Sequence, residues 1–232
     1  MQETIGKNTG FSFSSGKMDK KEYILLAIIV LMFAVASFTY NAVPEKIPSH
    51  WNKSGEIDGY SSRIVGLFLL PVIALCFYIL ISAIPYIAVY RKNILSFYSY
   101  IFLFKLVFIV FIFVLHIAVI IFALGFRFKF NYIIVPMLSL LLFTAGVIMK
   151  KSKRNYFIGV RTPWTLSSDK VWDKTNRIGG IGFQLISLLL LFGVFFPENY
   201  IFFIFVPLFC FSIFLVIFSY KEYAKEKKNR NL

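Results

Sequence analysis

Six long runs of apolar residues, separated by shorter polar segments, dominate this chain. The runs cover residues 23–43, 64–90, 97–124, 132–149, 178–196 and 200–220. An α-helix rises about 1.5 Å per residue, so about 20 mainly apolar residues are enough to cross the hydrocarbon core of a bilayer. The pattern therefore predicts an all-α, polytopic membrane protein built as a bundle of six transmembrane helices.

The composition supports a membrane protein. Hydrophobic residues make up 59% of the 232 residues, whereas soluble proteins average about 45–50%. The 29 Phe residues are too many for the core of a soluble protein of this length. Cys76 and Cys210 fall inside apolar runs, so we interpret them as small buried hydrophobes rather than as a disulfide or metal ligands. We expect no metal and no cofactor.

The basic residues gather on one side of the predicted bundle. The net charge is +14, from 25 Lys and Arg against 11 Asp and Glu. With six spans, both termini and the second and fourth loops share one side and hold 19 Lys and Arg, while the other three loops hold five. Because basic loops stay in the cytoplasm, we predict that both termini are cytoplasmic. This bias accounts for the positive charge, so we expect no direct contact with nucleic acid.

The polar segments divide the chain into four parts. Residues 1–16 are rich in Gly and Ser, and we expect a flexible polar tail. Residues 17–96 hold the first two spans and a long outward loop, and residues 97–220 hold the other four spans and a long cytoplasmic loop. Residues 221–232 form a basic tail, whose lysines we expect to meet anionic membrane lipid.

The outward loop, NAVPEKIPSHWNKSGEIDGYSSR, mixes prolines and glycines with aromatic and polar residues. Proline fixes the backbone and glycine permits tight turns, so the loop should have a defined shape. It either closes the outer end of the bundle at the membrane interface or forms a recognition surface for an extracellular ligand. A catalytic role for its histidine would need an oriented partner, which the sequence does not specify. The candidate binding residues are His50, Trp51, Asn52, Asp58 and Tyr60.

The long cytoplasmic loop, between the fourth and fifth spans, also carries shape-determining residues. Thr162 precedes a proline and should be extended rather than helical. Ser167 or Ser168 can cap a helix that begins directly afterwards. We expect an interfacial clamp in which Trp164 and Trp172 enter the inner headgroup layer. A contact surface for a cytoplasmic partner is one alternative. A site for an anion or a lipid headgroup around Arg154, Arg161 and Arg177 is another.

Both loops resemble motifs of known families. The stretch PEKIPSHWNKSGEIDGY is similar to the P-x-x-I-P-x-H-W-N-x-x-G-x-x-D signature of a small membrane domain of uncharacterised function. The stretch NYFIGVRTPWTLSSDKVWDKTNRIGG resembles the R-T-P-W motif region of the SdpI-like immunity family. The cytoplasmic match, whose residues would be structural or partner-binding, includes Asn155, Gly159, Arg161, Thr162, Pro163, Trp164, Trp172 and Thr175.

The resemblance implies a function. It implies an integral membrane protein that protects the cell against a secreted, membrane-active toxic peptide. It further implies a signalling receptor that sequesters a cytoplasmic transcriptional repressor. The residues alone leave open a small membrane transporter of peptide or lipid, for which broken helices near Pro71, Pro85 or Pro207 would be typical. The chain has no H-E-x-x-H or G-x-S-x-G motif, and we expect no enzyme.

The polar residues of most interest within the apolar runs are Lys105, His116 and Gln184. Lys105 lies near the cytoplasmic end of its span, and we expect it to extend to the interface. His116 lies near the middle of the same span and should be neutral, bonded to Asn41, Gln184 or a backbone carbonyl. None of the six predicted spans contains a carboxylate, which argues against a proton relay and so against ion-coupled transport.

Overall fold

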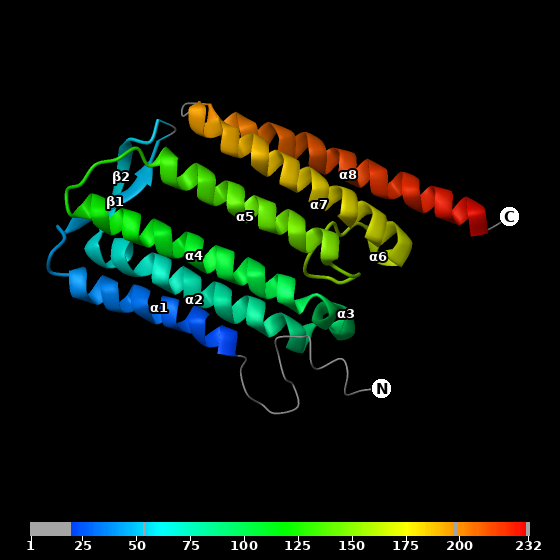
Figure 1. The fold of residues 1–232 in the computed structure, drawn as a ribbon, viewed down its shortest axis with the longest axis horizontal. Coiled ribbons are helices and arrows are strands. Elements are labelled where there is room, and N and C mark those ends of the chain that lie inside the picture. Colours follow the sequence, from blue (N-terminus) through cyan, green and yellow to red (C-terminus); the bar gives the residue numbers. More distant parts are fainter. Residues whose placement is uncertain (1–19, 53, 197–198, 231–232) are drawn as a thin grey trace.

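The computed structural model describes residues 20–52, 54–196 and 199–230 (Figure 1). Its long helices are α1 (Lys20–Thr39), α2 (Arg63–Ile87), α4 (Tyr98–Ala123), α5 (Asn131–Lys151), α7 (Asp169–Phe192) and α8 (Tyr200–Arg230). Among the described residues, six helices are long and apolar enough to cross a membrane, which confirms the predicted fold class. The expected flexible tail at residues 1–16 lies outside the described residues.

The long helices follow one another across the molecule in chain order. α4 packs against α1, α2 and α5, then α5 packs against α7 and α7 against α8, as Figure 1 shows from one edge of the bundle to the other. Buried apolar residues between α1 and α4 include Leu25, Met32 and Ile109. The outermost helix, α8, leaves most of its apolar side chains exposed, as expected for a surface in contact with lipid. Cys76 and Cys210 are exposed as well, so the expectation that they are buried is wrong.

The two ends of the bundle carry different short elements (Figure 1). One end, which we call the termini end, holds the start of α1 and the end of α8 together with α3 (Arg91–Ser96) and α6 (Pro163–Ser167). The other, the hairpin end, holds strands β1 (Lys46–Trp51) and β2 (Ile57–Ser62). The short 3-10 helix η1 (Gly193–Phe195) lies beside it, directly after α7. Each of the two motif-bearing loops therefore forms its own structured cap on the bundle.

The hairpin end is closed by a two-stranded antiparallel sheet that the sequence pattern did not predict. β1 (Lys46–Trp51) pairs with β2 (Ile57–Ser62), and the register is irregular around His50. Gly55 in the connecting turn has a φ of 81°, a conformation that glycine adopts without steric cost. β1 packs against α2 and α4, so the hairpin is seated on the bundle.

α5 and α7 approach each other most closely. A Cβ on Gly146 or on Gly180 would collide with the carbonyl oxygen of the other glycine. Small residues permit such close approach between transmembrane helices. α7 runs without interruption through these glycines, from the loop into the bundle.

Candidate functional site

The hairpin brings His50 and Asp58 into direct contact. His50 Nδ1 lies 2.5 Å from Asp58 Oδ1 across the two strands. A Cβ on Gly59, the partner of His50 in the sheet, would lie only 2.8 Å from the His50 Cβ, so glycine makes this crossing possible. The histidine therefore has an oriented carboxylate partner. Both side chains are well exposed, at 70% and 45%, so the pair contributes little to stability.

Asn52 shapes the turn of the hairpin. Its Oδ1 accepts hydrogen bonds from the backbone N–H groups of Ser54 and Glu56, at 2.9 and 3.0 Å. Its Nδ2 donates to Glu56 Oε2 at 3.1 Å. These bonds use both ends of the side-chain amide, so the principal role of Asn52 is to hold the turn that carries its neighbours.

Trp51 is held by other aromatic rings of the protein rather than by the bilayer alone. It stacks on Phe130 with ring centroids 4.2 Å apart, and its edge meets Phe122 at 5.4 Å. The indole is half-buried, and its Nε1 is buried with no hydrogen-bond partner among the described residues. Tyr60, by contrast, is 60% exposed. Trp51 and Tyr60 therefore have different surroundings: the first packs against the bundle, and the second is exposed.

A cavity of about 350 Å³ lies between the hairpin and the helices. Its walls are mostly apolar, with a few polar groups, which is typical of ligand-binding pockets. His50, Trp51 and Asn52 line it, whereas Asp58 and Tyr60 do not. The helices contribute Val65, Gly66, Leu69, Leu70, Leu115, Val119, Asn131 and Ile134. We call this space the hairpin cavity. Tyr60 lines a separate, more open hollow together with Arg63.

Lys105 is buried in an ion pair that the sequence did not predict. Its Nζ donates to both carboxylate oxygens of Glu22, at 2.7 and 2.8 Å, and to Ser82 Oγ at 3.1 Å. Lys105 is 0% exposed and Glu22 2% exposed. Lys105 therefore does not reach the interface, and the prediction that no span contains a carboxylate is wrong. Glu22 lies in the first turn of α1, one residue before the apolar run begins.

The other intramembrane polar residues have nearby partners. His116 is fully buried, and its Nε2 lies 3.0 Å from the carbonyl oxygen of Leu67 in α2. A backbone carbonyl was one of the three partners expected for it. Gln184 lies in α7 and accepts a hydrogen bond from Lys150 Nζ at 3.1 Å. These contacts join neighbouring helices, and they place no two of Lys105, His116 and Gln184 together.

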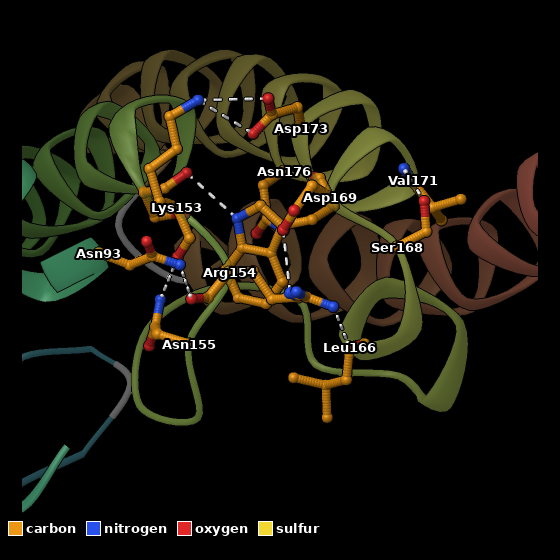
Figure 2. A network of polar contacts seen from close by, with 12 residues as sticks. Asn93, Lys153, Arg154, Asn155, Leu166, Ser168, Asp169, Val171, Asp173 and Asn176 are labelled. Carbon is orange, nitrogen blue, oxygen red and sulfur yellow. Dashed lines mark hydrogen bonds and ion pairs between the residues drawn. The ribbon is translucent and has the colours of Figure 1, made fainter. Parts of the chain in front are cut away.

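The motif loop between α5 and α7 is a compact hydrogen-bonded structure (Figure 2). Asn155 is fully buried, and its Oδ1 accepts the N–H groups of Phe157 and Ile158, both at 2.7 Å. Its Nδ2 donates to the carbonyls of Lys153 and Ile158. Asn93 of α3 donates to the Arg154 carbonyl at 2.7 Å, which fastens the loop to the preceding helices.

Trp172 lies inside this structure and not in a headgroup layer. It is 0% exposed, and its Nε1 donates to the Ser152 carbonyl at 3.1 Å. Asn176, one turn further along α7, accepts the N–H of Val160 at 2.7 Å. Gly159 has a φ of 117°, and a Cβ there would lie 2.5 Å from Asn176 Oδ1. The predicted placement of Trp172 at the membrane interface is therefore wrong.

The R-T-P-W segment joins the loop to α8. Thr162 is extended, as predicted, and forms a capping box with Thr165 at the start of α6. Its Oγ1 donates to Ser219 Oγ of α8 at 3.1 Å. Pro163 occupies the first turn of α6, and Trp164 packs against Tyr220 of α8 with ring centroids 5.2 Å apart.

Charged residues connect the motif loop to α7 and α8. Ser168 caps α7, as predicted, and also donates to Glu226. Arg154 Nε lies 2.9 Å from Asp169 Oδ1 (Figure 2). Lys174 Nζ lies 2.6 Å from Glu222 Oε2 of α8. Most of the motif residues therefore contact other residues of this protein. Thr175 is buried, whereas Arg161 is exposed.

Comparisons with known proteins agree with both motifs. Residues 151–221 match the SdpI/YfhL protein family, and residues 27–75 match a domain of unknown function, DUF1648. The chain is similar to Immunity protein SdpI of Bacillus subtilis (strain 168), with 26% identity over 214 residues, which is 91% of this chain and 100% of that protein. No solved structure matches the chain. The family resemblance predicted from the two loops is confirmed.

Proposed function

We propose that this multi-pass membrane protein, which carries an SdpI/YfhL family region, protects the cell against a secreted, membrane-active toxic peptide. The similarity to Immunity protein SdpI along nearly the whole chain supports an immunity-protein role. The proposed activity is recognition of the peptide, and it needs no cofactor and no bond-breaking chemistry.

The hairpin cavity carries the proposal. It combines apolar walls of helix residues with a rim of His50, Trp51 and Asn52. With the orientation expected from the charge bias, this end of the bundle faces outward, toward an arriving peptide. A membrane-active peptide is rich in apolar side chains, and one such side chain fits a mostly apolar cavity whose polar rim can bond to the peptide backbone.

The rival function, transport of peptide or lipid, gains less support. Transporter sites are typically built from broken helices near the middle of the membrane. Here the helices that contain Pro71, Pro85 and Pro207 are each continuous. We do not extend the proposal to a transcriptional repressor, because most motif residues at the termini end are engaged within the chain.

Replacing Trp51 with Ala should strongly reduce protection. Truncation of a tryptophan buried in an interface often costs about 2 kcal/mol or more, which corresponds to roughly thirtyfold weaker binding. Asp58→Asn should have a smaller effect, because it removes only the charge that orients His50. The measurement is the survival of cells that express each variant at the wild-type membrane level, titrated with the cognate peptide.

A matched control is Phe38→Ala. Phe38 is an aromatic residue near the same end of the bundle, but it is 90% exposed and lies outside the hairpin cavity. It should protect like the wild type. If Trp51→Ala and Asp58→Asn each protect fully, the hairpin takes no part in recognition of the peptide. The family relationship would not be affected by that result.

The orientation of the bundle can be tested separately. We predict that both termini are cytoplasmic, which places Tyr60 outside the cell and Lys170 inside. Both residues are exposed in the structure. In a variant whose native cysteines are replaced, Tyr60→Cys should react with a membrane-impermeant maleimide in intact cells, and Lys170→Cys only after lysis. The reverse labelling pattern would place the hairpin cavity on the cytoplasmic side and exclude it as a site for a secreted peptide.

A further inference from the structure

A second apolar groove lies at the termini end, beneath the motif loop. Its volume is about 520 Å³. Side chains of α4, α5, α7 and α8 line it, and these helices lie next to one another in chain order across the bundle. Its walls include Phe104, Ala145, Phe183 and Leu215. We call it the loop groove, because residues 157–162 of the motif loop line part of it.

The loop groove is open toward the surrounding bilayer. Ser212 and Val216, which line it from α8, are both exposed. The bond between Thr162 and Ser219 fixes the level of the loop on α8. Ser212 lies seven residues before Ser219, so the groove reaches about 10 Å below the loop along the helix. Ser212 lies in the apolar part of α8 that is long enough to cross a membrane, so the groove follows the membrane-spanning part of this helix.

A positively charged side chain, that of Arg161, lies at the edge of the loop groove. Arg161 lines the groove and is exposed, and its Nη1 donates to the Tyr156 carbonyl at 2.5 Å. This bond uses one of the five N–H donors of the guanidinium. Arginine suits phosphate because its planar fork can donate two parallel hydrogen bonds.

We propose that the loop groove binds an anionic phospholipid, with one acyl chain along the apolar walls and the phosphate on Arg161. The charge of Arg161 selects the headgroup, and the apolar walls select the chain. A groove that opens at this depth is filled by the molecules of the bilayer, because its walls offer water few polar partners. The bound lipid would thus contact both α4 and α8.

Thermal unfolding of the purified full chain in a neutral detergent tests the proposal. Dioleoyl phosphatidylglycerol should raise the unfolding midpoint by roughly 5 °C near saturation, and dioleoyl phosphatidylcholine should raise it less. Arg161→Gln should abolish the difference between the two lipids. Arg177→Gln, which removes another exposed arginine at the same end but outside the groove, should preserve it.

A second pair of variants tests the apolar part of the groove. Ser212→Phe fills the groove from an exposed position, so it should fold normally and lose the response to both lipids. Ile213→Phe alters a neighbouring residue that is 48% exposed and outside the groove, and it should respond like the wild type. Equal effects of the two lipids on the wild type, or equal losses in Arg161→Gln and Arg177→Gln, would overturn the proposal in favour of unspecific lipid contact.

Discussion

Replacing Glu22 with Ala should lower the free energy of unfolding by about 3–5 kcal/mol. The change leaves the Lys105 ammonium group buried at 0% exposure, without its carboxylate. The remaining donors and acceptors, Ser82 Oγ and Tyr98 OH, are neutral and lie 3.1 and 3.4 Å from Nζ. A buried charge with only neutral partners is costly in a low-dielectric environment. The measurement is the folded fraction in detergent, followed by chromatography and thermal unfolding.

Two further variants separate the lost charge pair from lost packing. Glu22→Met combined with Lys105→Met should regain much of the stability, because no charge is then left unpaired. Asp173→Ala breaks an exposed ion pair with Lys153 and should cost about 1 kcal/mol or less. If Glu22→Ala unfolds at the wild-type temperature, the pair does not stabilise the contact between α1 and α4.

The burial of Glu22 could not be predicted from the sequence. The spans could be predicted because a stretch of about 20 apolar residues has few stable arrangements other than a membrane-spanning helix. The first apolar run begins at Tyr23, so the pattern places Glu22 in the polar segment before the span. Its partner, Lys105, lies 83 residues further along the chain. Contacts between helices so distant in sequence leave no local pattern from which to predict them.

The caps of the motif loop could be predicted, whereas its interior could not. Ser168 as a cap and Thr162 as an extended residue depend on their immediate neighbours. The burial of Trp172 depends on how α7 packs against the end of α5, which brings the indole to the Ser152 carbonyl. The hairpin was missed for a related reason: Pro48 within β1 is typical of a loop, and the short strands are stabilised by contact with α2 and α4.

Replacing Trp172 with Ala should be the most damaging change within the motif loop. It removes the largest fully buried side chain and leaves the Ser152 carbonyl without its indole donor. Truncation of a buried tryptophan typically costs about 3–5 kcal/mol. The expected result is a large loss of folded protein in detergent and a lower unfolding midpoint for the fraction that remains.

Trp164→Ala is the matched comparison, because it removes the same side chain from a half-buried position against Tyr220. Its cost should be clearly smaller, although the amount of folded protein should still fall, as it should for Pro163→Ala. The relative loss of stability in Trp172→Ala and Trp164→Ala distinguishes a folding role of the motif from a binding role. If the motif serves mainly to hold α5, α7 and α8 together, stability and protection should decline in parallel, and Trp172 should matter more. A Trp172→Ala protein that accumulates and unfolds like the wild type, yet no longer protects the cell, would instead show that this loop acts through a partner.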